Sequence, residues 1–154
     1  MCLRLVGSEM CIRDRCALTA VSNGVFEVSP IFYLGLSVFM VGFLIEVIAD
    51  NQKTSFRAIP ENRNSFITTG LWSVSRHPNY FGEVTLWAGI AIMSVPYLKG
   101  IQYWTLISPI FSFVLIYFVS GVRMLEARAN VKWGENLEYQ AYVKKTPIFF
   151  PRIF

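Results

Sequence analysis

Polar and aromatic side chains are concentrated between Gly70 and Glu83, directly before an apolar stretch. Within this run, Pro78 disfavours helical geometry at His77 and suits the first turn of a helix. The pattern therefore predicts a helix that begins near Pro78, with Asn79 and Tyr80 at its N-terminus. Free backbone N–H groups and the helix dipole at such an end favour an anion, for example a phosphate.

Three side chains of this run are charged or can exchange a proton. Arg76 supplies a permanent cation whose planar guanidinium suits forked contacts with phosphate oxygens. Glu83 lies four residues after Asn79 on the same helical face, at the membrane edge, where an ionisable group is costly unless it is paired or functional. His77, the single histidine, could act as a general acid, although a histidine that is hydrogen-bonded within a loop is the commoner case.

A second polar cluster follows the first apolar stretch. Glu46, Asp50 and Lys53 share one helical face by their three- and four-residue spacing. Arg57 follows Asp50 by seven residues, two turns along the same face. Such a face could bind a base or ribose through its polar groups and a phosphate through its cations. It could equally be an ordinary charged helix end that reaches for water, and spacing alone does not decide.

The sequence predicts no metal site. The three cysteines, Cys2, Cys11 and Cys16, all lie in the first sixteen residues, and one histidine cannot complete a Cys/His array. A Walker phosphate loop, a Gly-x-Gly-x-x-Gly turn and a Gly-x-Ser-x-Gly elbow are all missing from the sequence.

The composition assigns these clusters to a membrane protein. Of the 154 residues, 54% are hydrophobic and only 16% are charged, whereas soluble domains have about 25% charged residues. These values exclude a disordered chain, a highly charged nucleic-acid module and an ordinary soluble globule. The net charge of +4 is spread between apolar stretches, so we expect a lipid bilayer as the partner and no nucleic acid.

Three apolar stretches predict an all-α, polytopic helical bundle with about three transmembrane helices. They are 31–49, 84–98 (extended by 80–82) and 101–122, close to the roughly 20 residues that a span requires. Pro96 and the Lys99-Gly100 pair predict a tight turn that joins the last two stretches as a hairpin. Gly35, Gly42 and Gly89 are expected to allow close helix packing.

Basic residues predict the orientation. Four lie in the segment 50–79 and six from Arg123 onward, whereas the turn between the last two stretches holds only Lys99. The positive-inside rule therefore makes the loop 50–79 and the C-terminal tail cytoplasmic in a multi-pass protein. We expect the tail to form an interfacial helix, or a helix pair broken near Gly134, that ends at Thr146-Pro147; a solvated amphipathic tail is the alternative. The segment 148–151 is expected to dock at the membrane interface.

The first fifteen residues look foreign to the rest of the chain. Met1-Cys2-Leu3-Arg4 recurs as Met10-Cys11-Ile12-Arg13, and the segment has no apolar region long enough for a signal peptide. The string resembles translated sequencing-adapter read-through. We therefore interpret residues 1–15 as an artefactual leader and 16–154 as the membrane domain, and expect the natural protein to begin further upstream.

From about residue 31 to residue 154, the chain resembles the C-terminal half of the steroid 5-alpha-reductase superfamily, in particular its bacterial branch of unknown function. The resemblance rests on three strings: Asp50-x-Gln-Lys…Phe-Arg57, Gly-Leu-Trp…Arg-His-Pro-Asn-Tyr-Phe-Gly-Glu83, and Ser120-Gly…Glu126…Trp133-Gly…Glu138-Tyr-Gln-Ala-Tyr142…Thr146-Pro. It implies a multi-span membrane enzyme that uses NADPH to reduce a carbon–carbon double bond in a steroid-like, other lipid or terpenoid substrate.

The resemblance also implies residue roles. Asp50 and Arg57 would hold the nucleotide, and Arg123 would contact its phosphate. Asn79 would line the nicotinamide end of the site. The implied catalytic residues are Glu83, Tyr80 and His77, and the other implied cofactor-binding residues are Lys53, Arg76, Glu126, Tyr139, Tyr142 and Lys145.

Two other interpretations remain open. A methyltransferase similar to isoprenylcysteine carboxyl methyltransferase also carries an Arg-His-Pro-x-Tyr motif before a membrane helix and would use S-adenosylmethionine. The upstream string from Asp50 to Arg57 favours the reductase. The third interpretation is an inactive membrane fragment, because the groups that polarise the carbonyl in steroid-reducing members lie largely in an N-terminal half that this chain lacks.

Overall fold

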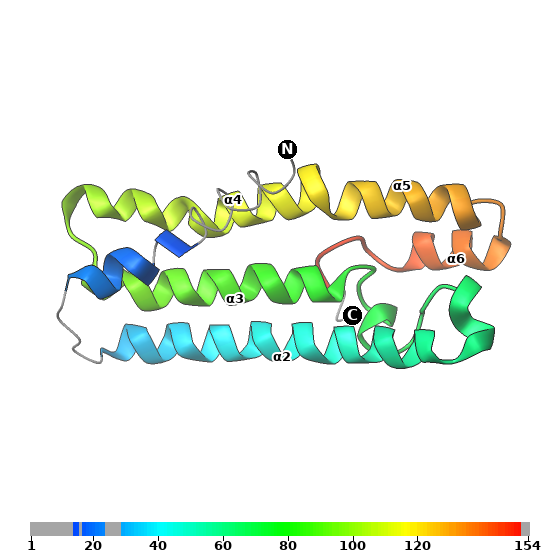
Figure 1. Ribbon diagram of the computed structural model, residues 1–154, viewed down its shortest axis with the longest axis horizontal. Helices are drawn as coiled ribbons and strands as arrows, with labels where there is room; N and C mark the ends of the chain where they lie inside the picture. Colours follow the sequence, from blue (N-terminus) through cyan, green and yellow to red (C-terminus); the bar gives the residue numbers. More distant parts are fainter. Residues whose placement is uncertain (1–13, 16, 24–28, 152–154) are drawn as a thin grey trace. The chain divides into compact units, whose positions relative to one another are not determined.

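The computed structural model describes residues 14–15, 17–23 and 29–151 (Figure 1). It is 82% helical, and the described residues contain no β-strand, which confirms the predicted all-α class. The three cysteines and nearly all of the expected leader lie outside the described residues.

Helix α2 runs from Pro30 to Ala58 and is longer than the apolar stretch that predicts it. The polar residues that follow Ala49 include neither proline nor glycine until Pro60, so nothing in them interrupts the helix. The three charged residues of the Asp50–Arg57 string therefore lie on the same helix as Glu46.

Helix α3 runs from Pro78 to Ser94, and its start at Pro78 confirms the sequence prediction. A 3₁₀ helix follows at Val95–Tyr97, where Pro96 interrupts the α-helical hydrogen bonding. Gly100 then takes a positive φ of 52° and opens the next 3₁₀ helix, Gly100–Ile107.

The remaining helical segments follow one another closely. They are α4 (Ser108–Val114), a π-helical segment (Leu115–Ser120), α5 (Val122–Trp133) and α6 (Leu137–Lys145). The turn between α5 and α6 contains Gly134, which confirms the helix pair expected in the tail. Asn136 caps α6 because its side-chain oxygen accepts hydrogen bonds from the backbone N–H groups of Glu138 and Tyr139.

Two helical segments are long and apolar enough to cross a membrane. They are Pro30–Ala58 and Gly100–Trp133, whose apolar stretches have mean hydropathies of 2.3 and 2.0. Helix α3 has 17 residues, which is shorter than the roughly 20 that a span requires. Two of the three expected spans are thus long and apolar enough to cross a membrane. The span expected at α3 stays a prediction.

The chain forms two compact units. Unit 1 comprises Met1–Gly42 and Val84–Leu115. Within it, α2 and α3 approach closely at two glycines: a Cβ atom on Gly35 would lie 2.5 Å from the backbone nitrogen of Met93, and one on Gly89 would collide with the backbone of Phe39. This approach confirms the packing role expected for these two glycines.

Unit 2 comprises Phe43–Glu83 and Ile116–Phe154. Between α2 and α3 it contains two short 3₁₀ helices, Pro60–Asn64 and Gly70–Ser73. Gly70 has a positive φ of 62°, and a Cβ atom there would lie 2.5 Å from the side-chain nitrogen of Gln52. The side-chain oxygen of Gln52 accepts a hydrogen bond from the backbone N–H of Leu71 at 3.0 Å. A side chain of α2 therefore fixes the backbone at the start of the 3₁₀ helix Gly70–Ser73.

The C-terminal segment packs along the loop that precedes α3. The backbone N–H of Arg76 donates to the carbonyl of Pro147 at 2.9 Å, and the hydroxyl of Ser75 donates to the carbonyl of Phe149 at 2.9 Å. Phe149 is buried, whereas Phe150 is 68% exposed. Phe149 thus packs inside unit 2, which differs from the expected docking of the whole segment at the membrane interface.

Candidate functional site

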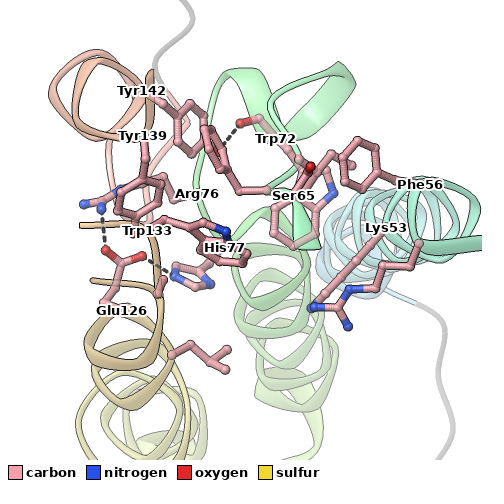
Figure 2. A pocket seen from close by; sticks show the side chains of 15 residues that line it. Lys53, Phe56, Ser65, Trp72, Arg76, His77, Glu126, Trp133, Tyr139 and Tyr142 are labelled. Atoms are coloured by element: carbon pink, nitrogen blue, oxygen red, sulfur yellow. Dashed lines mark hydrogen bonds and ion pairs between the residues drawn. The ribbon is translucent and has the colours of Figure 1, made fainter. Parts of the chain in front are cut away.

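Unit 2 contains an open cavity of about 150 Å³ (Figure 2). Its lining comes from the end of α2, the loop before α3, α5 and α6. The lining residues are Lys53, Phe56, Arg57, Ser65, Phe66, Ile67, Trp72, Arg76, His77, Leu125, Glu126, Ala129, Trp133, Tyr139 and Tyr142.

Aromatic rings form one wall of the cavity. The ring centroid of Phe66 lies 5.9 Å from that of Trp133, 5.2 Å from that of Tyr139 and 5.9 Å from that of Tyr142. These separations lie in the range of favourable aromatic pairs. The wall is therefore a packed cluster that offers ring faces and edges to a planar ligand.

Hydrogen bonds from indole and phenol groups hold this wall in place. The indole N–H of Trp72 donates to the carbonyl of Ala49 on α2 at 3.0 Å, and that of Trp133 donates to the carbonyl of Asn64 at 2.8 Å. The hydroxyl of Tyr142 donates to the carbonyl of Trp72 at 2.6 Å. Each large ring is thus tied to the backbone of another segment, which fixes its orientation.

Two basic side chains of α2 line the cavity. The ammonium of Lys53 lies 5.3 Å from the centroid of a Trp72 ring, within the range of a cation–π interaction. Arg57, one turn further along α2, lines the same cavity. The combination of aromatic faces and cations suits a ligand with a planar ring and an anionic group.

A carboxylate on α5 joins two residues of the loop before α3. One oxygen of Glu126 pairs with the guanidinium of Arg76, and the other lies 2.8 Å from Nε2 of His77 (Figure 2). The imidazole of His77 also stacks on the ring of Tyr80, with centroids 5.8 Å apart and an interplanar angle of 21°. His77 is thus held by α5 on one side and by α3 on another.

The two tyrosines of α6 keep their protons in this setting. Burial raises the pKa of Tyr142 above its usual value, and so does the charge of Glu126, while the nearby Arg76 opposes both. Burial also raises the pKa of Tyr139, with the same opposing effects of Glu126 and Arg76. Both phenols are therefore neutral hydrogen-bonding groups near neutral pH.

The cavity brings together about half of the residues expected from the sequence. Lys53, Arg57, Arg76, His77, Glu126, Tyr139 and Tyr142 line it.

The other expected residues do not line this cavity. Asp50, Arg123 and Lys145 are exposed. Asn79 is half-buried, and its side-chain oxygen is buried with no hydrogen-bond partner among the described residues. Those not in the lining are Asp50, Asn79, Tyr80, Glu83, Arg123 and Lys145.

Some of these residues lie near one another on α2 and α3. Glu83 lies within electrostatic reach of Glu46 and of Tyr80, and Asp50 lies within reach of the same two side chains. This grouping matches the helical face that the sequence predicts for Glu46 and Asp50. Among the described residues, no group of three or more His, Cys, Asp or Glu side chains could hold a metal ion.

Sequence reasoning identified Tyr139 and Tyr142 but missed the other large aromatic residues of the cavity, which are Phe56, Phe66, Trp72 and Trp133. Trp72 and Trp133 occur in the strings on which the family resemblance rests, but their type alone suggested no role. Phe56 and Phe66 carry no local signal, because their contribution depends on contacts with residues far away in the sequence.

Comparison with known proteins identifies the family. A family model described as "Protein of unknown function (DUF1295)" matches residues 15–146. The human 3-oxo-5-alpha-steroid 4-dehydrogenase 1 is 26% identical over 125 residues, which are 81% of this chain and 43% of the human protein. The Arabidopsis thaliana steroid 5-alpha-reductase DET2 is 35% identical over 125 residues, which are 80% of this chain and 42% of that protein.

A methyltransferase is also similar to the chain. The probable O-methyltransferase ustE of Ustilaginoidea virens is 31% identical over 92 residues, which are 56% of this chain and 32% of that protein. The chain spans about two fifths of the length of the two steroid reductases. No solved structure matches it. The match over most of the chain, together with the steroid reductase relatives, shows that the chain belongs to the DUF1295 family within the steroid 5-alpha-reductase superfamily.

Proposed function

We propose that this chain is the cofactor-binding part of an NADPH-dependent membrane reductase that acts on a carbon–carbon double bond of a lipid-like substrate, such as a steroid or terpenoid. The observation that carries the proposal is the cavity in unit 2, where cations of α2 meet an aromatic wall. The two steroid reductases that resemble the chain support the reaction class.

The chemistry of the cavity fits part of NADPH. Lys53 and Arg57 supply cations for phosphate oxygens, and the aromatic wall supplies faces for a planar ring. A volume of about 150 Å³ is comparable to a site that holds one small aromatic ring. We therefore assign one ring of the cofactor to the cavity, with Asp50, Arg123 and Lys145 as contacts for parts outside it.

The residues beside the cavity would serve the reactive end. When bound, NADPH supplies a hydride to one carbon of the double bond. The unpartnered side-chain oxygen of Asn79 is suited to accept a hydrogen bond from a carboxamide, such as that of nicotinamide. Glu83, Tyr80 and His77 are the candidate catalytic residues, and their tasks would be to orient the substrate and to move a proton.

The apolar helices support a membrane setting for this reaction. Many large hydrophobic side chains of α2 are exposed, including Leu34, Val41 and Leu44, as expected for contact with lipid. We propose a multi-pass arrangement with α3 as the third span, and with the loop 50–79 and the C-terminal tail on the cytoplasmic side. A hydrophobic substrate would then reach the site from the bilayer.

A methyltransferase is the second candidate, and the resemblance to the probable O-methyltransferase ustE favours it. The charge of the cavity favours the reductase instead. Lys53, Arg57 and Arg76 outnumber the single carboxylate, Glu126, in the lining. S-adenosylmethionine carries a positive sulfonium and no phosphate, so cations assist its binding less than that of NADPH.

The proposal is tested by titrating the chain in lipid nanodiscs with NADPH and measuring heat. We expect the Arg57→Ala variant to bind NADPH about tenfold to a hundredfold more weakly, because a charge-assisted hydrogen bond contributes about 1.5–3 kcal/mol. The matched control is Arg63→Ala, which removes an exposed arginine that does not line the cavity. Equal affinity of the two variants would remove the support for the cavity as the cofactor site. A chain that binds no NADPH is what the inactive-fragment interpretation predicts.

A further inference from the structure

Glu126 uses both of its carboxylate oxygens on residues about fifty positions earlier in the chain. Oε1 lies 2.8 Å from Nε2 of His77, and Oε2 pairs with the guanidinium of Arg76. The side chains of Arg76 and His77 are 9% exposed, and that of Glu126 is 18% exposed. Because all three are largely withdrawn from water, their mutual interactions are stronger than those of surface pairs.

The partner of Nε2 determines where the imidazole carries its proton. An ionised carboxylate only accepts hydrogen bonds, so Nε2 of His77 must donate and must carry a hydrogen. A neutral imidazole has a single N–H. With that hydrogen at Nε2, Nδ1 is the nitrogen that gains and loses a proton.

We propose that Glu126 is a positioning residue, which fixes His77 in the Nε2–H tautomer and makes Nδ1 the proton-exchanging atom in the cavity wall. This role differs from the cofactor contact that the family resemblance implies for Glu126. It does not depend on which cofactor the chain binds. It gives the cavity a group that can accept a proton from a ligand oxygen when neutral and donate one when protonated.

The side chains that share the cavity with His77 leave Glu126 as the anionic acceptor for its Nε2–H. The cations Arg76, from its own loop, and Lys53 and Arg57, from α2, line the same cavity and offer no acceptor. Tyr80 stacks on the ring as a neutral neighbour from α3. Tyr139 and Tyr142 of α6 line the cavity with phenols whose pKa is raised by burial. Glu126 is thus the carboxylate of the lining that holds Nε2 of His77.

The inference can be tested by nuclear magnetic resonance on the full chain in nanodiscs, without nucleotide. His77 is the single histidine of the sequence, so labelling histidine with ¹⁵N gives the signals of one imidazole. Long-range ¹H–¹⁵N correlations report which nitrogen carries the proton. We expect the neutral ring to carry it on Nε2 and the titrating signal to be that of Nδ1. A neutral ring protonated on Nδ1 would overturn the proposal without any variant being made.

Three variants test the source of this effect. Glu126→Gln should weaken the preference for the Nε2–H tautomer, because the amide that replaces the carboxylate can donate a hydrogen bond to Nε2 as well as accept one. Arg76→Gln should keep that preference, since the carboxylate of Glu126 still accepts from Nε2. Glu126→Asp keeps a carboxylate and should restore most of the wild-type preference.

The matched control is Glu135→Gln, which removes an exposed carboxylate outside the cavity lining. It should leave the neutral ring of His77 protonated on Nε2, because Glu135 lies outside the cavity lining that contains His77. Equal effects of Glu126→Gln and Glu135→Gln would overturn the proposal. Because this experiment contains no nucleotide, its failure would not affect the proposal that the chain is part of a reductase. Conversely, a failure to bind NADPH would not affect the proposed role of Glu126.

Discussion

The hydroxyl of Tyr142 donates a hydrogen bond of 2.6 Å to the main-chain carbonyl of Trp72, although the two residues are 70 positions apart. This contact joins α6 to the 3₁₀ helix Gly70–Ser73, and the same tyrosine ring packs against Phe66 in the cavity wall. One side chain therefore anchors the tail and shapes the candidate site.

Replacing Tyr142 by phenylalanine should destabilise unit 2 with little change in shape. The variant leaves the buried carbonyl of Trp72 without its donor, which costs about 1–3 kcal/mol. For a chain of this length, each kcal/mol lowers the melting temperature by about 2–4 °C. Scanning fluorimetry in nanodiscs measures this change, and Tyr103→Phe, at a residue that is 49% exposed, should be close to neutral. Equal melting temperatures of the two variants would contradict the anchoring role.

The same substitution should change how stability depends on alkaline pH. Burial raises the pKa of Tyr142, so above a pH of about 10 the folded chain keeps a proton that the unfolded chain has lost. The stabilisation from this neutral phenol is complete below pH 10 and decreases as the pH rises further. The difference in melting temperature between wild type and Tyr142→Phe should therefore become smaller between pH 9 and pH 11. A difference that stays constant would show that Tyr142 does not keep its proton.

A methyl group at Gly89 should disturb the packing of unit 1. A Cβ atom there would collide with the backbone of Phe39, which cannot move aside as a side chain could. Gly89→Ala should lower the free energy of unfolding by about 1–3 kcal/mol, as overpacking does. The control Ser37→Thr adds a methyl group at an exposed position of α2 and should have a small effect. If Gly89→Ala has the same melting temperature as Ser37→Thr, the backbones of α2 and α3 do not approach each other closely at Gly89.

Phe66 should contribute to ligand binding through its ring rather than its volume. It contacts three other aromatic residues of the cavity wall, and Phe66→Leu keeps much of the apolar volume while removing the aromatic face. We expect NADPH to bind more weakly by about threefold to tenfold, since an aromatic pair contributes about 0.5–1.5 kcal/mol. Phe43→Leu, at a residue that is 43% exposed, is the control. Unchanged affinity for Phe66→Leu, measured by calorimetry, would place the planar ring elsewhere.

Local sequence features predict most of the helix boundaries. Pro78 predicts the start of α3 because its ring fits the first helical turn. Gly134 predicts the break between α5 and α6 because glycine weakens a helix interior. Hydropathy does not predict the end of α2, because it falls after Ala49 whereas the helix continues to Ala58.

The composition of the cavity could be predicted only in part. Its charged members stand out in the sequence, because a charge beside an apolar stretch requires an explanation. Phe66 and Trp133 do not stand out, since aromatic residues are common in this chain and only tertiary contacts between distant segments select these two. The hydrogen bond between the backbones of Arg76 and Pro147 could not be predicted from the sequence either, because it involves no side chain.

We propose that the cavity in unit 2 binds part of a phosphate-bearing dinucleotide. The most direct test is the thermal stabilisation of the full chain in nanodiscs by NADP⁺ and by S-adenosylhomocysteine, each titrated over the same range. A ligand at a hundredfold excess over its dissociation constant stabilises the folded state by about 2.7 kcal/mol. We predict that NADP⁺ raises the melting temperature with increasing concentration and that S-adenosylhomocysteine does so far less. Preferential stabilisation by S-adenosylhomocysteine would contradict the assignment of a dinucleotide to this cavity.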